Sequence, residues 1–211
     1  MNLGFIGTGT IASCVITGIF KSKILFNKIY ISKRNEKNSQ KLKRKYKKVF
    51  IEDNNQGIID KCDWIFLSVT PYVGNKIIKK LKFKSNQTVI SFISTITLPQ
   101  LKKAIKVKAK ILKAIPLPPI SLKKGPIPIC PPNKKVKAFF DKVGSTVEIK
   151  NEKSSINFWS TSGMMAPFYQ LLSSMTDWLV KKGVKRNNAQ KYITSLFLAL
   201  SQDAVINSKK I

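Results

Sequence analysis

The chain has 211 residues, of which 43% are hydrophobic, and a formal net charge of +29 at pH 7. This length suits one large domain or two smaller ones, and the apolar fraction is sufficient for a packed core, which argues against intrinsic disorder. No apolar run is long enough to cross a bilayer, no secretory signal is visible, histidine is absent and the three cysteines lack C-x-x-C spacing, so we expect a metal-free cytoplasmic protein that does not enter membranes.

The first element is an apolar run over residues 2–6 that predicts a strand, followed at once by the turn Gly7-Thr8-Gly9-Thr10-Ile11-Ala12 and an apolar helix. A dinucleotide pyrophosphate needs this order of strand, glycine turn and helix. Gly7 permits the tight turn, and Gly9 lets the backbone approach the phosphates. An ordinary strand-to-helix turn is the alternative, but the context favours a dinucleotide. The candidate cofactor contacts here are Ile6, Gly7, Thr8, Gly9, Thr10 and Ile11.

The second predicted strand, residues 28–31, ends at Ser32-Lys33-Arg34-Asn35. A cofactor with a free ribose hydroxyl usually meets an Asp or Glu at this position. Two cations and two neutral hydrogen-bonding groups suit a ribose phosphate instead, and the Arg34 guanidinium has the shape to grip it and to stack on adenine. We therefore predict NADP(H) in preference to NAD(H), with a solvated basic turn as the alternative. Ser32, Lys33, Arg34 and Asn35 are the predicted contacts.

The densest lysine run, Lys41 to Lys48, carries Leu42 and Tyr46 at helical spacing. We interpret it as the solvated basic face of a second helix, because lysines are spread along the whole chain. Nucleic-acid surfaces more often combine arginine with stacking aromatic residues, so we predict no specific nucleic-acid partner. Binding to nucleic acid through charge alone stays an alternative, and it predicts a steep salt dependence.

Strands and helices then alternate along the chain. The predicted strands are residues 49–51, 64–69, 88–93 and 110–115, and the predicted helices are residues 53–61, 73–81 and 98–105. This alternation predicts an α/β fold of the Rossmann type, with a doubly wound, mainly parallel sheet. Ligands of such sheets lie beyond the carboxyl ends of the strands. Further candidate cofactor contacts are therefore Ser68, Val69, Thr70, Pro71, Phe92, Ile93 and Ser94.

Seven prolines crowd residues 116–132, which predicts extended, locally rigid backbone rather than helix. We interpret this stretch as a structural connection, with a substrate wall as the alternative. A helix over residues 134–143 that stops at Gly144 and a strand over residues 146–149 complete the predicted nucleotide-binding domain, residues 1–150.

From residue 151 the pattern is helical only. One apolar face runs from Phe168 to Leu179 before a stop at Gly183, and a second runs from Ala189 to Leu200 after the predicted caps Asn187 and Asn188. Two helices with this much apolar surface need the first domain or another subunit to bury it. We therefore predict that residues 151–211 form a dimerisation or substrate domain in a homodimer or higher homo-oligomer.

These segments together resemble the pyrroline-5-carboxylate reductase family over nearly the whole chain. Besides the glycine turn, the matching segments are Asn55, Ser68-Val69-Thr70-Pro71, Ser91-Phe92-Ile93-Ser94-Thr95, Ile115-Pro116-Leu117-Pro118-Pro119, and Thr161-Ser162-Gly163. The resemblance implies an NADPH-dependent reductase of a cyclic imine, pyrroline-5-carboxylate to proline. It also implies that Asn55 lies by the cofactor and that Ser162 and Gly163 lie near the substrate. The alternative for these two residues is a helix cap and a close packing contact.

The chain departs from the family pattern at several positions. Thr70, Thr95 and Leu117 replace the family's Lys, Gly and Asn, and its Pro-Gly-Gly-Thr-Thr loop would lie beyond Ile211. The chain is then either a shortened copy or an NADP-dependent oxidoreductase with a different small substrate. A β-hydroxyacid dehydrogenase is disfavoured because Pro167 stands where that group carries its catalytic lysine. A non-catalytic nucleotide-binding relative is the last alternative.

Overall fold

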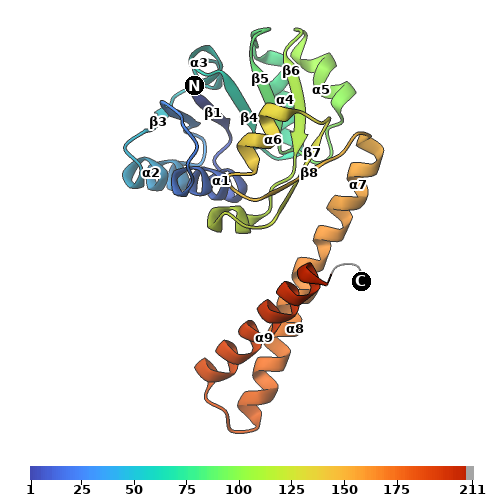
Figure 1. Cartoon of the computed structure of the whole chain (residues 1–211). Coiled ribbons are helices and arrows are strands. Elements are labelled where there is room, and N and C mark those ends of the chain that lie inside the picture. The colour runs from blue at the N-terminus through green and yellow to red at the C-terminus, as the bar shows by residue number, and fades with distance from the viewer. Residues whose placement is uncertain (208–211) are drawn as a thin grey trace. The chain divides into compact units, whose positions relative to one another are not determined.

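The computed structural model describes residues 1–207 and contains two compact units, Met1–Trp159 and a second unit that begins at Ser160. The boundary between the units falls within α7, after the predicted domain boundary at residue 150. Within residues 1–207, the first unit carries an eight-stranded sheet in the order β3-β2-β1-β4-β5-β6-β7-β8 (Figure 1). This order places β1 and β4 at the centre of the sheet, where the chain reverses its direction of winding.

The elements have the following bounds. The strands are β1 Leu3–Ile6, β2 Ile29–Ser32, β3 Val49–Glu52, β4 Trp64–Leu67, β5 Thr88–Ser91, β6 Lys110–Ala114, β7 Pro126–Cys130 and β8 Ser145–Glu148. The α-helices are α1 Thr10–Lys21, α2 Glu36–Lys45, α3 Asn55–Lys61, α4 Pro71–Ile77, α5 Leu98–Ile105, α6 Lys134–Phe140, α7 Glu152–Thr161, α8 Met165–Lys181 and α9 Arg186–Ile206. Short 3-10 helices are η1 Ile78–Lys80, η2 Pro118–Leu122 and η3 Ser162–Met164.

The sheet is parallel from β3 to β6, β7 runs antiparallel to β6, and β8 is parallel to β7. The predicted fold, a doubly wound and mainly parallel α/β sheet followed by helices, is therefore confirmed. Because β1, β2, β4, β5 and β6 are mutually parallel, their carboxyl ends meet along one edge of the sheet. Parallel sheets place ligands at this edge, and we call it the carboxyl edge below.

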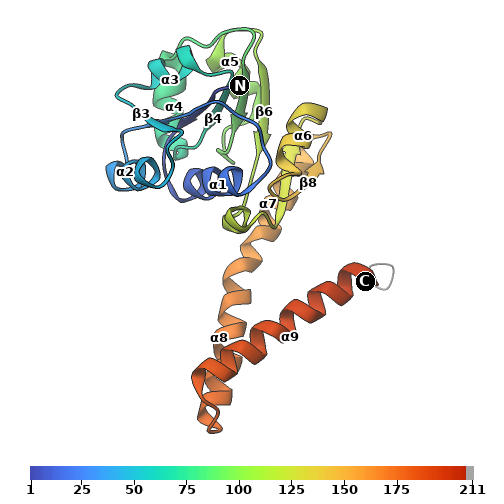
Figure 2. The same cartoon turned by 60° about the vertical axis from the view of Figure 1, so that its left-hand side comes forward.

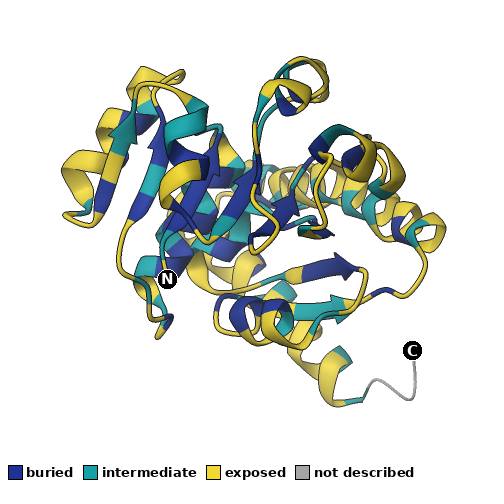
Figure 3. Ribbon diagram, turned by 90° about the horizontal axis from the view of Figure 1, so that it is seen from above, coloured by how far each residue is buried: buried dark blue, intermediate teal, exposed yellow. Residues whose placement is uncertain are grey.

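Helices cover both faces of the sheet, as Figure 2 shows for α1 and α2 on one side and α3 and α4 on the other. Successive residues of a strand pack into two different hydrophobic cores, one on each face of the sheet. Phe5 and Phe66 point toward α1 and α6, whereas Ile6, Ile65 and Leu67 point toward α3, α4 and α5. The phenyl rings of Phe5 and Phe66 stack with their centroids 4.5 Å apart. The central strands are accordingly the most deeply buried part of the unit (Figure 3).

Helix α1 lies unusually close to η2. A Cβ atom added to Gly18 would come within 2.4 Å of the backbone oxygen of Ile120, so a residue without a side chain is needed at this contact. The proline-rich stretch is thus partly helical, and the prediction that it is extended throughout was wrong over η2. It also contains β7, a strand that was not predicted because Pro126 and Pro128 have no N–H to donate to a neighbouring strand.

Several helix boundaries also differ from prediction. Helix α6 ends at Phe140 and not at residue 143, so the prediction that it stops at Gly144 was wrong. Helix α3 begins at Asn55 and not at residue 53, and α4 covers Pro71–Ile77 and not residues 73–81.

The structure ends α2 at Lys45 and gives Tyr46 extended backbone, so the basic helix is shorter than residues 41–48 suggested. The Tyr46 ring instead stacks on Phe20, with the centroids 4.0 Å apart. Helix α9 begins at Arg186, so Asn187 and Asn188 lie inside its first turn and are not its caps.

In the second unit α8 and α9 pack against each other, with Ala189 and Ile193 of α9 buried and the Phe168 ring edge-on to Phe197 at 5.6 Å. Gly183 has a φ of +92° and follows Lys182, the C-cap of α8, which confirms the predicted glycine stop. Among residues 1–207 we find no helix with the length and apolar character that a membrane span requires.

Candidate nucleotide-binding site

The predicted glycine turn lies at the carboxyl edge, between the end of β1 and the start of α1. Gly7 has a φ of +103°, and an added Cβ atom would come within 2.3 Å of the Ser68 carbonyl oxygen. The Ser68 N–H in turn donates to the Ile6 carbonyl at 2.8 Å. Glycine is therefore required at position 7 by the backbone conformation and by the close approach of the segment that follows β4.

At position 9, by contrast, neither the backbone conformation nor a close approach requires glycine. Its φ is −70°, and an added Cβ atom would meet no described atom within 4 Å. Gly9 precedes the first residue of α1, and no side chain among residues 1–207 caps this helix. The first-turn N–H groups of a helix have no partner within the helix, and the helix dipole makes this end positive. The turn therefore presents backbone donors beside open space, which is the geometry that binds a phosphate.

The Ser32 side chain forms a hydrogen bond with the glycine turn. It is buried at the end of β2, where its hydroxyl accepts the Gly7 N–H at 3.0 Å and donates to Asn55 Oδ1 at 2.8 Å. The Thr8 carbonyl accepts from Asn38 Nδ2 at 2.9 Å. The structure thus brings together Gly7, Ser32 and Asn55, three predicted cofactor residues from different elements. Because the Ser32 hydroxyl already bonds to Gly7 and Asn55, we interpret Ser32 as a brace that stabilises the turn.

The predicted phosphate corner after β2 is exposed and basic. Lys33 Nζ lies 3.4 Å from Asp53 Oδ1, and both side chains are largely exposed, so this ion pair is weak. Asn35 caps α2 by accepting the Asn38 N–H at 3.2 Å. Arg34 is exposed, and no carboxylate among residues 1–207 lies within ion-pair distance of it. Its guanidinium is therefore available to an anion.

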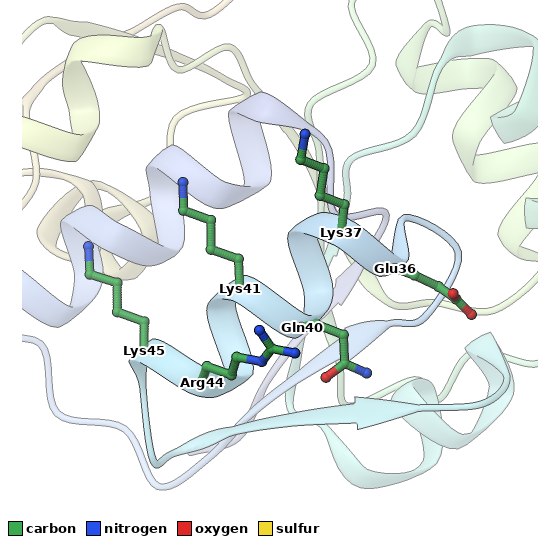
Figure 4. Close-up of a pocket in the computed structure, with 6 residues that line it drawn as sticks. All are labelled: Glu36, Lys37, Gln40, Lys41, Arg44 and Lys45. Carbon is green, nitrogen blue, oxygen red and sulfur yellow. The ribbon is translucent and has the colours of Figure 1, made fainter.

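The basic character of this corner continues along α2. A surface pocket begins at Glu36, directly after Asn35, and follows the helix to its end. Figure 4 shows Lys37, Lys41 and Lys45 in a row on one side of α2, with Arg44 on another side. Like charges four residues apart repel one another, so this row favours an anionic neighbour. It adds to the positive field at the adjacent corner.

The other predicted cofactor segments lie at the ends of β4 and β5. Ser68 and Val69 leave β4, and Thr70 and Pro71 lead into α4 with exposed side chains. Phe92, Ile93 and Ser94 follow β5, where Ile93 is buried and Ser94 is exposed. The parallel register of β1, β4 and β5 puts both segments at the same edge as Gly7. Their contacts with a cofactor stay predictions.

Sequence reasoning missed Lys113, a lysine of β6 whose side chain is only 2% exposed. Its Nζ donates to the Ser94 carbonyl at 2.8 Å and lies 3.0 Å from Glu152 Oε1. Loss of hydration lowers the pKa of Lys113, and the interaction with Glu152 opposes that shift. The only available signal was a lysine at an inward position of a short strand, and it was hidden among many surface lysines.

Ser162 and Gly163, the predicted substrate-proximal residues, lie in η3 of the second unit. An added Cβ atom on Gly163 would meet no described atom within 4 Å, which gives no support to the alternative of a close packing contact. Their proximity to a substrate stays a prediction.

Comparisons with known proteins found one matching family model and several similar solved structures. Residues 2–95 match the family model described as NADP oxidoreductase, coenzyme F420-dependent. A 1-pyrroline-5-carboxylate reductase from Streptococcus pyogenes is similar with a TM-score of 0.81 and 23% identity, over 97% of this chain and 79% of that one. A Plasmodium falciparum pyrroline carboxylate reductase solved with NADP bound has a TM-score of 0.85 and 21% identity, over 97% of this chain and 78% of that one.

A reductive aminase from Aspergillus terreus, solved with NADPH and ethyl-5-oxohexanoate, is more distant, with a TM-score of 0.65 and 12% identity over 99% of this chain and 76% of that one. No curated protein sequence matches. The chain therefore has the fold of the pyrroline-5-carboxylate reductases, and the resemblance found in the sequence is confirmed for the fold.

Proposed function

We propose that this chain is a member of the pyrroline-5-carboxylate reductase family and uses NADP(H) to reduce the C=N bond of a cyclic imine. One observation carries the proposal: the open space at Gly9, beside the uncapped start of α1, lies at the carboxyl edge next to the basic corner at Arg34. The fold, the matched family model and the NADP-bound structural neighbour support a nicotinamide cofactor.

The residues fit such a cofactor in three places. The backbone from Gly7 to Thr10 would bind the diphosphate, Lys33 and Arg34 would bind the ribose phosphate, and the segments after β4 and β5 would border the nicotinamide. When bound, NADPH supplies a hydride. The chain's own part is to orient the cofactor and to exclude water, which requires no histidine.

The cofactor preference is the first test. We expect tighter binding of NADPH than of NADH in a fluorescence titration. We expect Arg34→Ala to weaken NADPH by about tenfold more than it weakens NADH, because only NADPH loses a charge-assisted hydrogen bond to its phosphate. Arg44→Ala is the matched control, since it removes the same charge from α2 about two turns beyond the start of the helix. Equal affinity of the unaltered protein for both cofactors would refute the preference.

The substrate is tested separately. We expect NADPH oxidation when pyrroline-5-carboxylate is supplied, with proline as the product. Cofactor binding without turnover of this compound would reject it as the substrate and leave the oxidoreductase assignment intact.

A different small substrate is the second candidate, and Thr70 and Thr95 favour it. These threonines replace a lysine and a glycine of the family pattern, beside the two segments proposed to border the nicotinamide. Turnover of another cyclic imine from a panel, without turnover of pyrroline-5-carboxylate, would establish this candidate. Cofactor binding without turnover of any of them would favour a non-catalytic relative.

We propose further that the second unit associates with a second copy of the chain, in a homodimer or larger homo-oligomer. Apolar side chains lie exposed on both long helices, and they include Trp178 at 59% and Tyr192 at 63% exposure. A groove between α8 and α9 is lined almost entirely by apolar residues, with Ser174 as the exception. Exposed apolar surface of this kind is typical of an interface between subunits.

A further inference from the structure

Lys113 is a buried cation held by contacts with other groups of the chain. Its Nζ donates to the Ser94 carbonyl at 2.8 Å, lies 3.0 Å from Glu152 Oε1, and lies 4.3 Å from the centre of the Trp159 ring. A lysine that gives up its hydration destabilises the fold unless such contacts compensate. Here a carbonyl, a carboxylate and an aromatic face do so, which fixes the ammonium in one position.

Glu152 extends this network to α5. Both of its carboxylate oxygens lie 2.9 Å from the Leu98 backbone nitrogen, which donates to them. Leu98 is the first residue of α5, and a carboxylate is stabilised at this positive helix end. One ammonium therefore holds the connection between β5 and α5 near both of its ends, at Ser94 directly and at Leu98 through Glu152.

The connection so held is residues 92–97, and it lies at the carboxyl edge. Lys113 pairs in register with Ser91, the last residue of β5. Strands β4 and β5 lie on the side of β1 opposite to β2. A dinucleotide whose ribose phosphate is at Arg34 and whose diphosphate is at Gly9 extends in this direction, so its nicotinamide half reaches the ends of β4 and β5.

We propose that Lys113 is a positioning residue that keeps residues 92–97 in the conformation that receives the nicotinamide half of NADP(H). The inference rests on the proposed function, since it concerns the same site. Lys113 does not need to touch the cofactor. It acts through the Ser94 carbonyl and through Glu152. A neutral side chain of similar length at position 113 would leave both groups without a cation.

The test compares two ligands on three variants. NADPH spans the whole site, whereas 2′-phospho-ADP-ribose carries the ribose phosphate and the diphosphate but no nicotinamide. We expect Lys113→Met to weaken NADPH by about tenfold, because residues 92–97 lose the hydrogen bond at Ser94 that holds their receiving conformation, and to leave 2′-phospho-ADP-ribose unchanged. Lys113→Arg keeps the charge and restores NADPH binding. Lys110→Met is the matched control, an exposed lysine at the other end of the same strand.

A parallel loss of both ligands in Lys113→Met, or no loss of NADPH, would overturn the proposal. If Lys113→Met does not fold, Glu152→Gln gives the same comparison, because it removes the charge partner and keeps the shape: a selective loss of NADPH supports the proposal and a parallel loss overturns it. Failure of the proposed function itself looks different, since the unaltered protein would then bind neither ligand.

Discussion

At the scale of single residues, the two glycines of the first turn have separate roles. Gly7 is fixed by its backbone, with a positive φ and the Ser68 carbonyl where a Cβ atom would be. Gly9 has an ordinary φ and open space beside it. The first glycine therefore serves the fold, and the second leaves room for a ligand. Substitution by alanine separates these roles.

We expect Gly7→Ala to lower the free energy of unfolding by about 2 kcal/mol or more, because the left-handed backbone and the overlap with Ser68 both add strain. We expect Gly9→Ala to cost only about 1 kcal/mol or less, because alanine fits there although it caps a helix less well than glycine, and yet to weaken NADPH binding. Urea unfolding and a cofactor titration measure the two effects. Unchanged NADPH affinity in Gly9→Ala would contradict the assignment of this space to the diphosphate.

Much of the glycine turn was predictable from sequence, because each residue's requirement is local. The basic corner was also predictable, since Lys33 and Arg34 directly follow β2. The brace formed by Ser32 and Asn55 was not, because it joins residues far apart in the chain. Lys113 could not be recognised for another reason: in a chain with 39 Lys and Arg residues, one more lysine gives no sign that it is buried.

At the scale of elements, predictions succeeded where a helix carries its own boundary signals. Residues 98–105 were predicted without error for α5, which starts with the capping box of Thr97 and Gln100 and ends at Lys106 in the left-handed conformation. The same reasoning did not predict strand β7. Pro126 and Pro128 argue against a strand when they are considered alone, because they have no N–H to donate. Their carbonyl groups can still accept hydrogen bonds from a neighbouring strand, as the Pro128 oxygen does from the Ile115 N–H at 3.2 Å.

The contact between α1 and η2 gives a prediction at this scale. We expect Gly18→Ala to destabilise the protein by about 1 to 3 kcal/mol, although alanine is the better helix former, because the added carbon would overlap the Ile120 backbone. Gly163→Ala is the matched control, since nothing in the described part of the chain lies within 4 Å of the new carbon. A lower urea midpoint for the control than for Gly18→Ala would contradict the packing argument.

At the scale of the whole molecule, the proposed association of second units gives a direct test. We expect the protein to be a dimer or larger by light scattering, and Tyr192→Glu to shift it toward the monomer, because a charge would enter the apolar groove between α8 and α9. Gln190→Glu, two residues earlier on the same helix and also exposed, adds the same charge and should leave the mass unchanged. A monomeric unaltered protein would refute the association.

The position of β1 at the centre of the sheet affects how the protein is made. Leu3 pairs with Ile29 on one side and with Trp64 on the other, so β1 lacks its second neighbour until β4 has been synthesised. An apolar strand edge stays open during that interval, and such edges invite pairing with other chains. Nascent chains that stall before Leu67 should therefore be the ones that depend most on chaperones.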